Sequence, residues 1–313
     1  MSYRLPVAIA AFVLASTLVV AVVIVASHGT TTRPAVPTIP PATTAFPAPP
    51  PGAVVFAREA GRNALALAAV PGSPLLLQAS VVDEQGNGVS GLHVRFSVLH
   101  GGDVFVEASA RPCGPGCYTA HVGVVHPQRV AVDVRGTGTH TVWPVDFPGT
   151  WPPPDATALV TKAGRVWRGL KTLAFFDHIA SDPQHAVSTH WKVVAPDRLA
   201  YRIEHGSSAV VIGSTRWDKL SGGTWQKSQT VPLRQPQPFW VAVSNAHVLG
   251  AGTTRGAPVW RVSFFDPSTH AWFEVAIEKR TLRTLDLHMV TTAHFMHDVY
   301  GPFNAPVKIR PPG

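Results

Sequence analysis

The chain has 313 residues, of which 45% are hydrophobic and only 14% are charged. That length and apolar content allow two globular domains with their own cores, together with accessory segments. The formal net charge is +8, but no run of four basic residues occurs, so the charge is spread along the chain. This distribution argues against a nucleic-acid partner and favours a general attraction to anionic lipid head groups.

The amino-terminal 28 residues contain an uncharged apolar segment between Pro6 and His28. It is long enough to cross a membrane as a helix. Arg4 precedes the segment, which favours a cytoplasmic amino terminus. The alternative is a cleaved signal peptide, with Val25 and Ser27 before the cut. We expect a single-pass anchor in the cell membrane that leaves the bulk of the chain extracytoplasmic.

A segment rich in proline, threonine and alanine follows over residues 29–53 and predicts an extended tether. Residues 54–148 then alternate short apolar segments with turn residues. This is the pattern of a seven-stranded, immunoglobulin-like β-sandwich. The strand candidates are residues 64–70, 74–83, 92–99, 104–110, 118–125, 129–134 and 139–147.

Cys113 and Cys117 are the only cysteines and lie within this predicted sandwich. Outside the cytoplasm a disulfide is the usual state of such a pair, and it would close a short loop as a local staple. A metal or redox site is the alternative, although the spacing is not C-x-x-C and no second pair accompanies it. We therefore expect a disulfide.

The sequence GTWPPP at residues 149–154 marks a boundary, after which residues 155–312 predict a mostly β domain. Apolar residues recur at spacings of three and four between residues 156 and 170, which indicates an amphipathic helix with Asp155 as its N-cap. Ten antiparallel strand candidates follow. They are residues 172–179, 187–194, 199–203, 209–212, 215–220, 224–228, 240–250, 258–266, 271–278 and 284–291.

The most regular part of this domain is the meander at residues 199–228, where strand-length segments are separated by turn residues. Trp217 and Trp225 flank its last turn. We expect both rings to be buried on the concave side of a curved sheet, with an outward binding rim as the alternative.

Several stretches of the second domain carry a family resemblance: APDRLAYRI (195–203), VVIGSTRW (210–217), VWRVSFFDP (259–267) and LHMVTTAHFMHDVYGPFNAP (287–306). They resemble the carboxy-terminal domain of actinobacterial copper-resistance and copper-transport (CopD-like) proteins, a lipoprotein-carrier-like (LolA-like) half-barrel with packed helices. VVDEQGNGVSGLHVRFSV (81–98) and GPGCYTAHV (114–122) resemble the extracytoplasmic domain that precedes it.

The resemblance covers residues 54–312 and implies a LolA-like antiparallel half-barrel after the sandwich, with an association with copper handling. The family's multi-helix membrane bundle and its separate copper-binding domain are not found in this sequence. The resemblance therefore does not imply that this chain alone translocates copper.

Imidazole and thioether groups, which suit copper, gather near the end of the chain at His288, His294, Met296 and His297. In one continuous strand His288, His294 and Met296 would share a face, with His297 and Met289 opposite. We treat the four as candidate copper ligands. The alternative is that the methionines fill core while the histidines form local hydrogen bonds or face water.

Six aromatic residues are candidates for binding a hydrophobic ligand in an apolar cleft between the sheet and the helix. Alternatively, these rings are simply the core of the domain. They are Tyr201, Trp217, Trp225, Trp240, Trp260 and Phe264.

No G-x-S-x-G elbow, H-E-x-x-H motif or phosphate-binding loop occurs, so we expect no catalytic activity. The leading hypothesis is a membrane-anchored binding protein that assists copper homeostasis at the cell envelope, with a copper-transport membrane protein as partner. The first alternative is a carrier or sensor of lipid or lipoprotein in the half-barrel cleft. The second is a structural envelope protein without a small ligand.

Overall fold

The computed structural model describes residues 48–61, 63–83, 85–136, 139–180, 186–291 and 294–313. These described residues belong to one compact unit. The predicted anchor and most of the predicted tether lie outside the described residues. Within the described ranges, no helix is long and apolar enough to cross a membrane.

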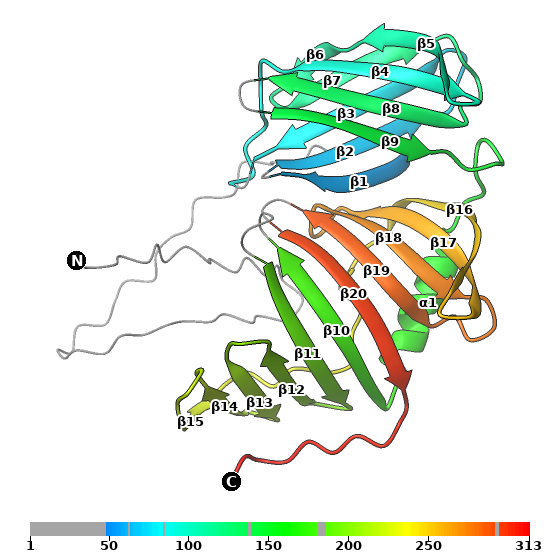
Figure 1. Ribbon diagram of the computed structural model, residues 1–313. Coiled ribbons are helices and arrows are strands. Elements are labelled where there is room, and N and C mark those ends of the chain that lie inside the picture. The colour runs from blue at the N-terminus through cyan, green and yellow to red at the C-terminus, as the bar shows by residue number, and fades with distance from the viewer. Residues whose placement is uncertain (1–47, 62, 84, 137–138, 181–185, 292–293) are drawn as a thin grey trace, which may run out of the picture. The chain divides into compact units, whose positions relative to one another are not determined.

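Nine strands form two antiparallel sheets in the first part of this unit (Figure 1), in the orders β1-β2-β3-β7-β6 and β5-β4-β8-β9. The strands are β1 (Val54–Ala60), β2 (Asn63–Val70), β3 (Leu75–Val82), β4 (His93–His100), β5 (Asp103–Ser109), β6 (Arg111–Gly114), β7 (Cys117–Val122), β8 (Arg129–Gly136) and β9 (Thr139–Asp146). Apolar residues of both sheets share one buried core, so the two sheets form a sandwich.

The seven strands predicted in this region are all present, and β1 and β6 are additional. Cys113 and Cys117 form a disulfide with their Cα atoms 5.0 Å apart, as predicted. The disulfide closes the β6–β7 turn. The immunoglobulin-like assignment of the sandwich stays a prediction.

One helix and an eleven-stranded antiparallel sheet form the second part. The elements are α1 (Thr157–Arg168), β10 (Thr172–Ala180), β11 (Ala186–Val194), β12 (Arg198–Ile203), β13 (Ser208–Ile212), β14 (Thr215–Lys219), β15 (Trp225–Gln229), β16 (Ser244–Thr254), β17 (Ala257–Asp266), β18 (Ala271–Glu278), β19 (Thr284–Thr291) and β20 (His294–Phe303). The open antiparallel sheet agrees with the expected half-barrel, and below it is called the large sheet.

The large sheet consists of two meanders that meet at β10 and β20. Its order is β15-β14-β13-β12-β11-β10-β20-β19-β18-β17-β16. The chain runs from β10 out to β15, crosses to β16 at the far edge, and returns strand by strand to β20 beside β10 (Figure 1). The sequence prediction missed β20 as a separate strand, because it treated residues 288–297 as continuous.

Helix α1 packs on one face of the large sheet, which we call the inner face. Its Trp167 ring meets Tyr300 edge-on at 4.5 Å and Trp240 at 5.8 Å between centroids. The predicted amphipathic stripe is confirmed by the burial of Val160 and Ala163. Asp155 is not the N-cap residue. It lies one residue earlier, where its carboxylate accepts hydrogen bonds from the Thr157 amide and hydroxyl groups.

The opposite, outer face of the large sheet contacts the sandwich through a second apolar cluster. Strand β2 alternates leucine and alanine. Leu65 and Leu67 enter the sandwich core, whereas Ala64 and Ala66 face Phe265 and other residues of the large sheet. The small alanine side chains allow close approach of the two layers. Both faces of β2 are therefore covered.

Candidate functional site

Three of the six predicted ligand-binding aromatic residues are part of the core on the inner face. Tyr201, Trp240 and Phe264 are 4%, 3% and 0% exposed. Their rings pack against neighbouring rings, for example Tyr201 on Trp191 at 4.8 Å and Trp240 on Phe264 at 5.5 Å. Their side chains fill the space in which a ligand was expected, so they favour the core interpretation over the cleft.

The other three aromatic candidates are partly exposed. Trp260 carries the Lys279 ammonium group 3.7 Å from its ring centroid. Trp217 and Trp225 lie on the outer face, because strand alternation and register place them opposite to the buried Tyr201. The expected burial on the concave side is therefore wrong for these two rings, which point outward; that they form a binding rim stays a prediction.

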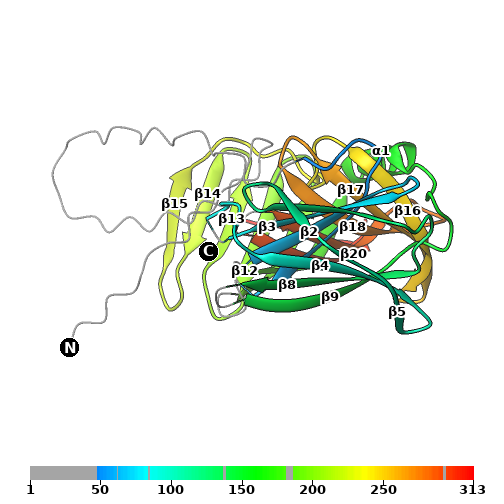
Figure 2. The same cartoon turned by 90° about the horizontal axis from the view of Figure 1, so that it is seen from above.

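A cavity of about 320 Å³ opens beside Trp225 in the segment β12–β15, which we call the wing. Figure 2 shows β14 and β15 projecting at one end of the sheet. Register sets Arg202, Ser208, Lys219 and Trp225 in one row of directly opposed residues across the four wing strands. The lining consists of this row with Ile203, His205, Gly206, Leu220, Ser221 and Gly222.

The wing cavity combines positive charge with an apolar rim. Arg202 and Lys219 contribute cations, and no carboxylate is among the lining residues. Within the described part of the chain, neither cation has an ion-pair partner. Leu220 at the mouth is 59% exposed, next to the partly exposed Trp225 ring. Such a lining suits an amphiphile with an anionic head group.

A second candidate site lies on the outer face of the hairpin β19–β20. His288 and His297 are directly opposed, and their rings stack at 4.0 Å with an angle of 10°. Asp286 lies between them, with its oxygens 3.4 Å from His288 Nε2 and 3.0 Å from His297 Nε2. Partial burial, with a smaller effect of the His297 ring, lowers the pKa of His288.

The hairpin corrects the predicted grouping of the copper ligands. Because the chain turns between β19 and β20, His288 pairs with His297 and Met289 pairs with Met296. Met296 is 5% exposed and lies on the inner face, away from the two histidines. The backbone of His294 pairs with Thr291, and its side chain lies outside the described part. Strand parity alone would have been correct only for an unbroken strand.

A buried carboxyl pair was missed by the sequence analysis. Asp177 of β10 and Asp298 of β20 are directly opposed on the inner face and are 2% and 0% exposed. Trp191 Nε1 donates to Asp177 at 3.3 Å, and the Tyr300 hydroxyl donates to Asp298. Burial raises the pKa of Asp177 to about 6, and burial together with Asp177 holds the pKa of Asp298 well above its ordinary value.

No protein-family model matches the chain, and no curated protein matches it. The solved structures that the chain matches include LprF from Mycobacterium bovis, at 12% identity and a TM-score of 0.39, over 51% of this chain and 99% of that one. Another is the Mycobacterium tuberculosis lipoprotein LppX, at 14% identity and a TM-score of 0.40, over 49% of this chain and 97% of that one.

A LolA superfamily protein from Nitrosomonas europaea also matches, at 10% identity and a TM-score of 0.22, over 51% of this chain and 96% of that one. The LolA-like assignment of residues 155–312 stays a prediction. Because each TM-score lies below 0.5, no function of this chain is inferred from these likenesses. The copper-protein context and the immunoglobulin-like assignment have no counterpart among these structures.

Proposed function

We propose that this is a non-catalytic, membrane-anchored extracytoplasmic protein that binds the head group of an anionic lipid in the wing cavity. The observation that carries the proposal is the cationic, carboxylate-free lining of that cavity beside exposed Leu220 and Trp225. The disulfide between Cys113 and Cys117 supports an oxidising compartment outside the cytoplasm.

The size of the cavity favours a lipid sensor at a membrane surface over a carrier that encloses its cargo. A volume of about 320 Å³ lies at the lower end of the range of about 300–1,000 Å³ that small-molecule pockets cover. The cavity accommodates a head group, while the acyl chains stay outside against Leu220 and Trp225. The inner face does not take the chains, since its aromatic residues are packed against one another.

The proposal is tested by titrating the full chain, held in dodecyl maltoside micelles, with two short-chain lipids. Dihexanoyl phosphatidylglycerol is anionic and dihexanoyl phosphatidylcholine is its zwitterionic control. Tryptophan fluorescence reports binding near Trp225. We expect tighter binding of the anionic lipid and a loss of about tenfold or more in Arg202→Gln/Lys219→Gln, because two charge-assisted contacts disappear.

The matched control is Lys192→Gln/Lys227→Gln, which removes the same charge from exposed lysines that do not line the cavity. This control is expected to bind like the parent. An equal loss of affinity in both double variants would mean that the net charge of the protein, and not the lining of the cavity, determines binding. Equal affinity for the two lipids would refute head-group recognition.

The copper-accessory role remains an alternative, but its predicted ligand set is not assembled on one face. Met296 lies on the inner face and His288 and His297 on the outer face. The lipid proposal does not depend on these residues, and the two activities are separable by mutation.

A further inference from the structure

Three side chains on the outer face of the β19–β20 hairpin converge on one point. Asp286 and His288 are two residues apart on β19 and share its outer face, and His297 is directly opposite His288 on β20. One ligand atom from each of the three residues can be chosen so that all lie within 4.8 Å of one another. The backbone pairing of two central strands fixes this arrangement.

The donor atoms lie close enough together for side-chain rotation to bring them around one metal ion. Zinc binds imidazole nitrogen and carboxylate oxygen at about 2.0–2.2 Å, which sets neighbouring tetrahedral donors about 3.3 Å apart. In the structure Asp286 Oδ1 lies 3.4 Å from His288 Nε2 and Asp286 Oδ2 lies 3.0 Å from His297 Nε2, and one donor atom from each residue lies within 4.8 Å of the others. The two rings stack at 10°, and because an imidazole nitrogen binds an ion in its ring plane, one ring has to tilt before both Nε2 atoms point at the same ion.

The donor set selects a class of metal. Two imidazoles and one carboxylate are borderline ligands that suit Zn²⁺ and Cu²⁺. Soft Cu⁺ prefers sulfur donors, but Met289 and Met296 form a pair on the other face of the hairpin. Calcium and magnesium require more oxygen ligands than Asp286 provides.

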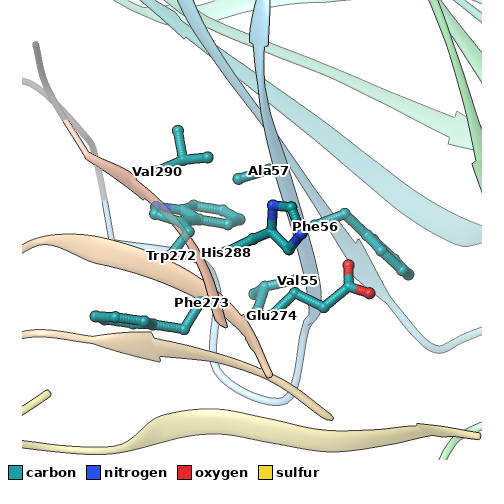
Figure 3. A pocket seen from close by; sticks show the side chains of 8 residues that line it. All are labelled: Val55, Phe56, Ala57, Trp272, Phe273, Glu274, His288 and Val290. Atoms are coloured by element: carbon teal, nitrogen blue, oxygen red, sulfur yellow. The ribbon is translucent and has the colours of Figure 1, made fainter. Parts of the chain in front are cut away.

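The surroundings leave one side of the cluster open. The side chains of His288, His297 and Asp286 are 58%, 40% and 26% exposed. On the other side, His288 belongs to a small cavity beside Val55, Phe56 and Ala57 of β1, as Figure 3 shows.

Glu274 is directly opposite His288 on β18, but its carboxylate is engaged by Arg261. The three donors therefore leave a fourth position to water or to an external ligand. That is the arrangement of an accessible site rather than a closed structural one.

We propose that Asp286, His288 and His297 bind one divalent transition-metal ion of borderline character, Zn²⁺ or Cu²⁺, at the edge of the contact between the sandwich and the large sheet. This site is independent of the wing cavity. It differs from the predicted copper set by including Asp286 and excluding Met296.

Equilibrium dialysis of the EDTA-treated full chain in micelles tests the proposal, with Zn²⁺ or Cu²⁺ as the probe and Mg²⁺ as the negative control. We expect one tightly bound Zn²⁺ or Cu²⁺ per chain and a loss of affinity of at least tenfold in Asp286→Asn and in His297→Asn. Copper electron paramagnetic resonance should show coupling to two imidazole nitrogens in the parent and to one in His297→Asn.

The matched control is His190→Asn. His190 also lies on the outer face and pairs with a carboxylate, at 2.9 Å from Glu204, but among the described residues it belongs to no group of three potential ligands. This variant should retain the bound ion. Unchanged binding in Asp286→Asn/His297→Asn, with its circular dichroism unaltered, would overturn the proposal. So would a copper site that is lost in Met296→Leu and kept in Asp286→Asn.

Discussion

The two ends of the outer face of the large sheet differ in what covers them. At the β17–β20 end, β1 and β2 cover the sheet, and Phe265 and Trp272 are 1% and 2% exposed. At the wing, Leu220 is 59% exposed and lies beside Trp225 and the two cationic residues that line the cavity. Aromatic residues occur on the outer face at both ends, so their presence alone does not distinguish a buried contact from a binding rim.

The largest expected loss of stability comes from a substitution at the covered end. Phe265→Ala should lower the free energy of unfolding by about 3–5 kcal/mol, because it leaves a cavity between two packed layers. Leu220→Ala in the wing should change it by less than about 0.5 kcal/mol. Denaturant unfolding of both variants measures the contrast, and a comparable loss in Leu220→Ala would mean that the wing rim is also packed.

The inner face differs from these two outer regions because it holds a buried carboxyl group whose contribution to stability depends on pH. The pKa of Asp177 is raised from 3.8 to about 6 in the folded protein because the group is buried. Between about pH 4 and 6 the folded state holds a proton that the unfolded chain loses, so the contribution of Asp177 to stability is fully present below about pH 4 and is lost as the pH rises through 6. A shift of this size corresponds to a loss of about 3 kcal/mol.

Asp177→Asn in metal-free protein should flatten this part of the stability profile, since the amide does not titrate. Chemical unfolding at several pH values between 4 and 7 checks the expectation. If the unfolding free energy of the variant changed with pH as steeply as that of the parent, other groups would be responsible for the pH dependence.

A smaller loss of stability is expected where the segment before β1 is attached to the large sheet. Asn245 donates hydrogen bonds from Nδ2 to the carbonyl groups of Pro50 and Ala53, at 2.7 and 3.1 Å. Its φ of 51° lies in the left-handed region, so Asn245→Gly removes the side chain without backbone strain. We expect a loss of about 1–2 kcal/mol and faster proteolysis near residue 50. Proteolysis unchanged from the parent would show that these bonds do not hold the segment.

Regular alternation made most of the strands predictable. The strands at 271–278 and 284–291 agree with the prediction residue for residue. The turn between β19 and β20 carries no glycine or proline in the sequence TTAH, so the hairpin gave no local signal. That one missed turn reversed the assigned face of His297 relative to His288.

The sequence analysis did not identify the carboxylates of the two polar clusters, Asp286 in one and Asp177 with Asp298 in the other. Asp286 and His288 have the i, i+2 spacing of ligands on one strand face, a signal that a search for histidine and methionine did not include. Asp177 and Asp298 meet only because β10 pairs with β20, and this long-range register has no local signature. Burial of the wing aromatics was mispredicted because alternation gives two faces but not which of them is covered.

The pairing of β10 with β20 also constrains when the large sheet can be completed during synthesis. Each meander can form from neighbouring strands, but the two can join only after residue 303 has emerged, since β20 is the final strand of the sheet. Until then β10 and β19 present unpaired backbone edges, which are templates for association with other chains. A chain truncated before β20 would therefore be expected to form two unjoined half-sheets that are prone to aggregate.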